Sequence, residues 1–274
     1  MRHCLVIIAV LLATACAAPA PRGGTGDSLV AAELAFARLA GTDGIRSAFL
    51  ANFADDGVVF EPAPVRVREA WPMRPAPADP RALNLVWTPA ISGLARAGDL
   101  GYTSGPFTLE AANGSRPAQH GVYFSVWRYA DSGWKVVLDA GILTPGPVAP
   151  SSLEPAPRLG PAPARAAGLD AVHGVERSLG GGADVARVLA ADARLAMDGA
   201  PPLIGRDTLR GKVAPNVAFR FTPAGGGAAA SDDLAYSFGA LMREGKPGFY
   251  AHLWTRDATG AWTLAVAIWY DATA

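Results

Sequence analysis

A single carboxylate within an apolar stretch is the first candidate for chemistry. Asp139 lies within 134–142, and strict alternation along a strand places it on the face opposite Trp134, Val136 and Leu138. A carboxyl that lined an apolar cavity would have a raised pKa and could act as a general base or acid. We favour the alternative, in which Asp139 lies on the outer face of the sheet, in solvent or paired with a loop.

Three aromatic residues are candidates for the wall of a ligand site. Trp87, Tyr102 and Tyr123 fall in expected strands, where their rings could line a cavity and the tyrosine hydroxyls could meet a ligand. With the carboxylate above, they form the predicted ligand-binding set. The two tyrosines recur as Tyr236 and Tyr250. This recurrence favours a structural role, because the same folding requirement then applies at two places in the chain.

Three further titratable residues have both a chemical and a structural interpretation. His252 alternates with Tyr250 and Trp254 along an expected strand and could be a general base. A strand histidine is more commonly hydrogen-bonded at the sheet surface. Glu33 and Glu61 could point into the mouth of a cavity, but solvated positions are more typical of glutamate.

The sequence predicts no metal site and no cofactor. Of the four histidines, those after residue 15 are not spaced as ligands of one ion, and a catalytic zinc needs about three converging protein ligands. The glycine runs 180–182 and 225–227 lack the lysine and hydroxyl residue that a phosphate-binding loop requires. Lys+Arg and Asp+Glu are equal at 24 each, so there is no basic excess for nucleic-acid binding.

The N-terminus is typical of an exported protein. A short positive start precedes the apolar run 5–12, which is too short for a membrane-spanning helix and is typical of a signal peptide over 1–15. Cys16 follows two small residues and resembles the bacterial lipoprotein box, although Ala13 stands where leucine is usual. The resemblance implies lipidation of Cys16 and a membrane-anchored periplasmic protein. The alternative is ordinary cleavage after Ala15, which would leave a soluble periplasmic protein.

The length and the distribution of prolines predict two domains. The chain has 274 residues, of which 50% are hydrophobic, too many for a disordered protein. A tether over 16–27 leads into a first domain at 28–143. Seven prolines mark a linker over 144–166, followed by a second domain at 167–274.

The two halves match in order and spacing. Residues 98–102 (GDLGY) correspond to 232–236 (DDLAY), and Tyr123 and Trp127 correspond to Tyr250 and Trp254. Ala267 stands where the first half has its candidate aspartate, so the second half is interpreted as a diverged copy.

The expected elements place helices before strands in each half. In the first, apolar residues repeat with helical spacing at Val30, Leu34 and Ala37, and a second helix over 45–53 has Asp43 as its expected cap. A strand over 58–60 and a short helix near 68–70 follow, and then strands over 83–91, 99–110, 119–130 and 133–142. The pattern predicts an α+β fold of two tandem domains, each with a mostly antiparallel sheet packed on N-terminal helices.

Several segments resemble one superfamily. Residues 98–107 (GDLGYTSGPF), 126–128 (VWR) and 133–139 (GWKVVLD), with 55–60 (DDGVVF), resemble the SnoaL-like or nuclear-transport-factor-two-like (NTF2-like) superfamily, and within it a ketosteroid-isomerase-like bacterial branch of unknown function. The resemblance implies a cone, in which a strongly curved sheet wraps around helices and leaves an apolar cavity at its open end. Members include isomerases, dehydratases, cyclases and transport adaptors, so fold says little about chemistry.

Three functions remain open from the sequence. We favour a protein that binds a small apolar or amphipathic ligand in the first cone. The second is an acid–base enzyme of the isomerase, dehydratase or lyase type, in which Asp139 acts with Tyr102 or Tyr123. The third is a non-catalytic envelope scaffold, whose second domain supplies an internal pseudo-dimer or which forms a homodimer.

Overall fold

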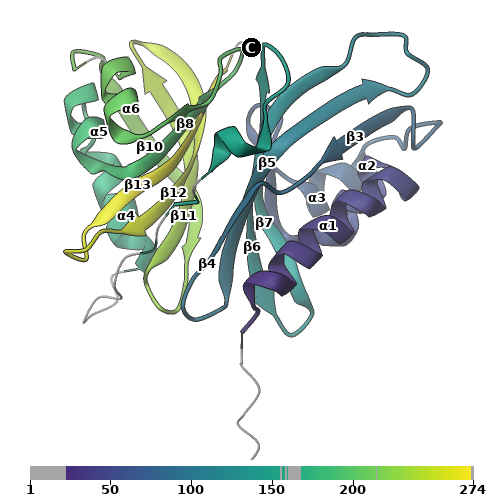
Figure 1. Cartoon of the computed structure of the whole chain (residues 1–274), viewed down its shortest axis with the longest axis horizontal. Coiled ribbons are helices and arrows are strands. Elements are labelled where there is room, and N and C mark those ends of the chain that lie inside the picture. Colours follow the sequence, from purple (N-terminus) through teal and green to yellow (C-terminus); the bar gives the residue numbers. More distant parts are fainter. Residues whose placement is uncertain (1–22, 155, 158, 160–167, 214, 273–274) are drawn as a thin grey trace, which may run out of the picture.

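The structure is a computed structural model that describes residues 23–154, 156–157, 159, 168–213 and 215–272 (Figure 1). The expected signal peptide and Cys16 lie outside these residues, as do parts of the expected tether and linker. Within them, no helix is both long and apolar enough to cross a membrane.

The described part of the chain forms two α+β domains, as the sequence predicts. Each contains one sheet with the same strand order: β2-β1-β7-β6-β5-β3, with β4 also paired to β5, and β9-β8-β13-β12-β11-β10. Neighbouring strands are antiparallel, except that β1 runs parallel to β7 and β8 parallel to β13. The first domain consists of α1 (Gly26–Asp43), α2 (Ile45–Asn52), β1 (Phe53–Phe60), β2 (Pro64–Arg66), α3 (Val67–Ala70), η1 (Trp71–Met73), β3 (Leu83–Trp87), β4 (Ile91–Leu94), β5 (Leu100–Ala111), β6 (Gln119–Ala130) and β7 (Gly133–Thr144). After η2 (Pro150–Leu153), the second consists of α4 (Gly168–Ser178), α5 (Gly182–Val188), β8 (Leu189–Met197), β9 (Leu203–Ile204), α6 (Arg206–Lys212), β10 (Phe219–Ala228), β11 (Leu234–Arg243), β12 (Lys246–Arg256) and β13 (Trp262–Asp271).

Helix α1 turns a different face to the core from the one expected. A capping box of Thr25 and Ser28 starts the helix, and its buried stripe is Leu29, Glu33, Phe36 and Ala40. Val30, Leu34 and Ala37 are only half-buried. The buried stripe includes Glu33, whose carboxyl accepts hydrogen bonds from side chains of the sheet. Because Glu33 is not apolar, a search for apolar periodicity does not find this stripe.

Two boundaries also differ from the expectation. Gly44, rather than Asp43, is the N-cap of α2, and its φ of 85° is a conformation that favours glycine. The expected strand over 83–91 is divided into β3 and β4. The expected strands over 99–110, 119–130 and 133–142 are confirmed within about two residues at their ends, which is the usual uncertainty of such boundaries. The expected strand over 58–60 is longer in the structure and begins at Phe53.

A β-bulge reverses the predicted faces of β7. Trp127 pairs with Val136 but Val126 pairs with Leu138, so Val137 is the extra residue. Beyond this bulge, Asp139 lies on the same face as Trp134 and Val136, on the helix side of the sheet. The prediction of an outer-face Asp139 is therefore wrong. β13 carries the corresponding bulge, because Trp254 pairs with Leu264 and Leu253 with Val266.

A buried glutamate joins the first helix of each domain to its sheet. Glu33 of α1 is inaccessible to solvent and accepts hydrogen bonds from the Trp87 and Trp127 indoles and from the Thr103 hydroxyl. The expectation of a solvated Glu33 is wrong, because these donors satisfy the carboxyl inside the protein.

The second domain repeats this arrangement. Glu176 of α4 is equally buried and accepts from the Ser237 and Tyr250 hydroxyls and from the Trp254 indole.

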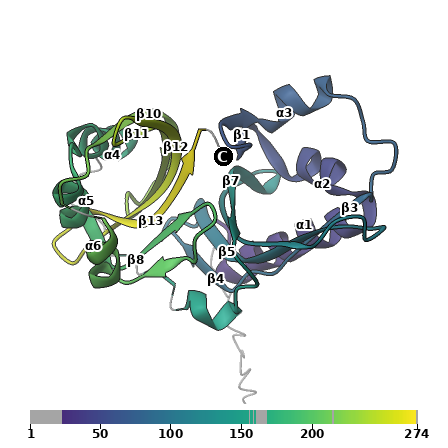
Figure 2. The same cartoon turned by 90° about the horizontal axis from the view of Figure 1, so that it is seen from above.

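The outer faces of the two sheets pack against each other (Figures 1 and 2). Phe60 of β1 stacks on Tyr270 of β13 with centroids 5.0 Å apart and lies edge-on to Phe238. Two turns exchange hydrogen bonds: the Asp99 carboxylate accepts from the Ala230 amide at 2.8 Å, and the Asp233 carboxylate accepts from the Arg96 amide at 3.2 Å.

The contact between the domains is approximately symmetric, because the two aspartates occupy matching positions in the repeated segments. Symmetric self-complementary contacts are typical of two-fold dimers. In this chain the two partners are parts of one molecule.

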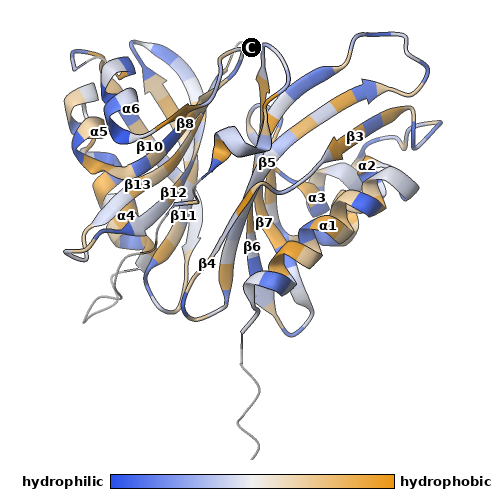
Figure 3. Ribbon diagram, viewed as in Figure 1, coloured by the Kyte–Doolittle hydropathy of each residue, from blue (hydrophilic) through white to orange (hydrophobic). Residues whose placement is uncertain are grey.

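Figure 3 shows hydrophobic and hydrophilic residues alternating along the strands of the two sheets, as strands with two differently covered faces require.

Candidate functional site

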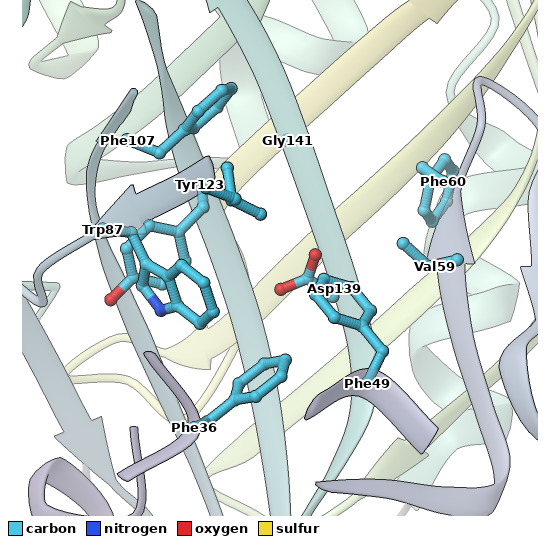
Figure 4. A pocket seen from close by; sticks show the side chains of 10 residues that line it. Phe36, Phe49, Val59, Phe60, Trp87, Phe107, Tyr123, Asp139 and Gly141 are labelled. Atoms are coloured by element: carbon cyan, nitrogen blue, oxygen red, sulfur yellow. The ribbon is translucent and has the colours of Figure 1, made fainter. Parts of the chain in front are cut away.

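The first domain contains a cavity between its helices and the helix side of its sheet. The cavity has a volume of about 170 Å³. For scale, an apolar cavity of about 150 Å³ accepts benzene. Six of the lining residues are aromatic or phenolic, and one is a carboxylate (Figure 4). The lining residues are Phe36, Phe49, Val59, Phe60, Leu85, Trp87, Phe107, Tyr123, Asp139 and Gly141.

Neighbouring aromatic rings that line this cavity are steeply inclined to one another. Phe36 lies at 64° to Phe49 and at 75° to Trp87, and Trp87 lies at 67° to Tyr123. Each of these rings comes from a different element, α1, α2, β3 and β6 respectively. The curved sheet and the two helices are therefore both needed to form the site.

Asp139 directs its carboxyl into the cavity, toward the side formed by Trp87 and Tyr123 (Figure 4). One carboxyl oxygen accepts a hydrogen bond of 2.6 Å from Ser125 on the neighbouring strand. Burial raises the pKa of Asp139 to about 7; the Ser125 hydrogen bond opposes this shift, and the nearby Glu33 adds to it. Both protonation states of Asp139 are therefore available near neutral pH.

Two of the other residues predicted for the cavity wall, Trp87 and Tyr123, do line the cavity. Their polar atoms lie behind it, on the side of the buried Glu33. The Trp87 indole N–H donates to Glu33, so only its ring faces the cavity. The Tyr123 hydroxyl is buried and lies beside Trp87 in Figure 4, away from the Asp139 carboxyl, and it interacts with the Thr103 hydroxyl. Burial raises the pKa of Tyr123 well above its ordinary value, and nearby Glu33 adds to the shift.

Tyr102 does not join this wall. It lies on the outer face of the sheet, packs near Phe124, and donates its hydroxyl to the Pro157 carbonyl at 3.1 Å. Its counterpart Tyr236 also belongs to the core between the sheets. The prediction that Tyr102 lines the cavity is wrong, because strand alternation alone does not say which face of the sheet is the inner one.

Glu61 also lies away from the cavity. It accepts a hydrogen bond of 2.9 Å from the Trp71 indole and pairs with Arg74 at 2.7 Å, near the protein surface.

His252 lies inside the second cone and is completely buried. The Trp269 indole can only donate, and it donates to Nε2 of His252, so that nitrogen is an acceptor. Nδ1 then carries the proton and donates to Glu176 at 2.9 Å. Burial raises the pKa of Glu176, but hydrogen bonds from His252, Ser237 and Tyr250 outweigh it and leave the pKa lowered. His252 holds no lone pair toward a ligand, so its role as a general base is wrong.

The second domain lacks the carboxylate and fills the matching space with a side chain. Tyr123 pairs with Gly141, and at the matching register Tyr250 pairs with Trp269. The Trp269 ring lies 5.2 Å from Phe219 and 6.3 Å from Phe221. Trp269 therefore occupies the place that Gly141 leaves open in the first domain. The hollow of about 170 Å³ that remains in the second domain lies beside the Trp269 ring and is lined partly by charged residues, Lys212, Arg243, Glu244 and Lys246.

Sequence reasoning missed several residues of the site. The α1 stripe through Glu33 contains a signal for Phe36, since both lie on one helical face. No local signal identifies Phe107 or Gly141, because their place depends on the bulge and on strand register. The missed residues are Phe36, Phe49, Val59, Phe60, Leu85, Phe107, Ser125 and Gly141. Among the described residues, no group of three or more His, Cys, Asp and Glu side chains is arranged to hold a metal ion.

Comparisons with known proteins find similar folds for part of the chain. A protein of unknown function with a cystatin-like fold from Nostoc punctiforme is 16% identical, matches 45% of this chain and 96% of its own, and gives a TM-score of 0.34. An NTF2-like protein of unknown function from Shewanella oneidensis is 13% identical, with 42% and 96% covered and a TM-score of 0.34. Δ5-3-ketosteroid isomerase from Mycobacterium sp. is 19% identical, with 42% and 91% covered and a TM-score of 0.33. No family model and no curated protein matches the chain.

Replacement of Asp139 by asparagine should change how stability depends on pH. Because the folded protein binds the Asp139 proton more tightly than the unfolded chain does, wild-type stability falls as pH rises from about 4 to about 7. Asp139→Asn keeps the neutral shape and removes this dependence. Urea unfolding should show the variant more stable by about 1–4 kcal/mol at pH 8, with the difference vanishing near pH 4.

The control is Asp207→Asn, at a side chain that is fully exposed. Its stability should follow the wild type across the pH range. A constant difference between Asp139→Asn and wild type from pH 4 to 8 would contradict the assignment.

Proposed function

We propose that the first domain binds a small apolar or amphipathic molecule in its cavity. The observation that carries the proposal is an aromatic-lined space with a single carboxyl directed into it. Apolar walls with a few oriented polar groups are the usual composition of small-molecule sites. A scaffold with two filled cones is less favoured, because the first cone is hollow.

The second domain supports the site and does not duplicate it. Its interior is occupied by Trp269 and by the His252–Glu176 pair. Its Tyr270 stacks on Phe60, which is part of the cavity wall, and donates its hydroxyl to the Gly141 carbonyl at 3.2 Å. We infer that the second domain serves as an internal partner that keeps the wall of the first cavity in place.

Acid–base catalysis is the second candidate, and the position of Asp139 favours it. A carboxyl with a pKa of about 7 can remove and return a proton near neutral pH. Binding stands first because the Tyr123 hydroxyl points away, so the described lining residues offer Asp139 no acid–base partner across the cavity.

Export and lipid anchoring at Cys16 are part of the proposal and rest on the sequence of 1–16. The apolar run and the cysteine after small residues support them. Two acyl chains or more would give a durable anchor, since each buried methylene contributes about 0.8 kcal/mol.

A tryptophan at position 141 should fill the cavity and prevent binding. A Cβ atom at Gly141 would lie 3.5 Å from the Phe107 ring, an ordinary contact, so a side chain can enter as Trp269 does in the second domain. Fluorobenzene titrated against wild type should show saturable broadening in ¹⁹F NMR spectra. Gly141→Trp should weaken this binding by about tenfold or more.

The matched control is Gly211→Trp on α6, where a Cβ atom meets nothing within 4 Å. It should bind fluorobenzene as wild type does. Equal binding of fluorobenzene by wild type and Gly141→Trp would show that the probe binds outside this cavity and would contradict the proposal.

Proton exchange at a carbon acid tests the second candidate. The Asp139 carboxylate would take a proton from the methyl group of acetophenone, leaving an enolate, and return a deuteron from D₂O. NMR should show exchange faster than the buffer rate, rising up to about pH 7 and then levelling. Asp139→Asn should abolish the acceleration.

Ser125→Ala gives this test its internal control. It removes a hydrogen bond that lowers the pKa of Asp139 and should move the inflection to higher pH. Exchange at the buffer rate with wild-type protein would exclude this chemistry for the probe and leave binding as the function.

Replacement of the two cysteines separates the two modes of export. In a bacterial host, Cys16→Ser should move the protein from the membrane fraction to the soluble fraction. Cys4→Ser should change nothing, because that residue lies in the segment expected to be removed. Wild-type protein found wholly in the soluble periplasmic fraction would instead support cleavage after Ala15.

A further inference from the structure

The cavity lining includes an acidic side chain and no basic one. Asp139 carries the ionisable group directed into it, and one of its two oxygens is engaged by Ser125, which leaves the other on the cavity side. No lysine, arginine or histidine is among the described lining residues. A buried carboxylate without a counter-charge is costly unless a partner satisfies it.

The other titratable groups that act on Asp139 are also acidic. Glu33 from α1, Tyr123 from β6 and Tyr270 from β13 each interact with it electrostatically. The remaining elements place uncharged side chains there, Val59 from β1 among them. None of these groups brings a positive charge to Asp139, so the ionised carboxylate has no counter-charge among them, and an anionic ligand would be repelled.

The walls suit a cation as well as an apolar group. Cations are attracted to the faces of aromatic rings, and cages of such rings are a common means of binding quaternary ammonium groups. Here Phe36 lies at 75° to Trp87, and Trp87 lies at 67° to Tyr123, so these three rings border the space from different sides. Phe49 is stacked on Phe53 and on Trp71 and contributes apolar surface only. The Trp87 N–H donates to the Glu33 carboxyl, which increases electron density on the indole ring.

We propose that the ligand of the first domain is a small organic cation, a protonated or quaternary amine whose charge lies between Asp139 and the aromatic walls. This inference rests on the proposed function and narrows it to one class of ligand. The cation supplies the counter-charge that the protein does not, and its methyl or methylene groups fill the apolar walls. The cavity volume of about 170 Å³ fits a headgroup of this size.

The test compares choline with 3,3-dimethylbutan-1-ol, which has the same shape with carbon in place of the charged nitrogen. Titrations followed by tryptophan fluorescence and by NMR should show that wild type prefers choline at pH 8 by about tenfold or more. Choline affinity should fall as pH is lowered below about 7, because the ionised carboxylate is the binding form. The neutral alcohol should show no such loss.

Asp139→Asn should lose the preference for choline and its pH dependence, and should still bind the alcohol. Retention of fluorobenzene binding by the same variant shows that its cavity is folded. Equal affinity of wild type for choline and the alcohol at pH 8, or an unchanged choline preference in Asp139→Asn, would overturn the inference.

The outcomes also distinguish a failure of the cation inference from a failure of the proposal that the cavity binds a small molecule. If fluorobenzene binds wild type but not Gly141→Trp, and choline does not bind, the cavity is a neutral-ligand site and only the cation inference fails. If neither fluorobenzene nor choline nor the alcohol binds, both fail together.

Discussion

The fold depends on a carboxylate buried between a helix and a sheet. In each domain the first helix carries a glutamate whose oxygens accept from an indole and from hydroxyl groups of the strands, Glu33 with Trp127 and Glu176 with Trp254. Such a group is costly to bury unless its acceptors are satisfied, so the helix has few acceptable positions along the sheet. This junction fixes which helical face points inward, and with it the distance between helix and sheet that a cavity requires.

The same framework leads to two different interiors through a few substitutions at matching positions. In the first domain Gly141 leaves space and Ser125 supports the Asp139 carboxyl. In the second domain Trp269 and His252 occupy those places and hydrogen-bond each other. In the second domain the buried polar side chains therefore hydrogen-bond one another. In the first domain one oxygen of the Asp139 carboxyl is directed toward the cavity.

Sequence patterns identified the fold class, the strands and the repeated tyrosines and tryptophans, because these depend on local periodicity. They failed where one extra residue mattered. The bulge at Val137 turns Asp139 from the outer face to the inner one, and no local composition marks it. Glu33 was misjudged for a related reason: the donors that make its burial acceptable lie 54 to 94 residues away along the chain.

The contact of Tyr270 with Phe60 and Gly141 has a consequence for dilution. When two separate chains brace each other's binding sites, the brace is lost as the protein is diluted below its dissociation constant. Here both partners belong to one polypeptide, so the brace forms at an effective concentration set by the linker and is independent of how many molecules are present. A protein arranged in this way keeps the cavity of its first domain formed even when a cell contains only a few copies of it.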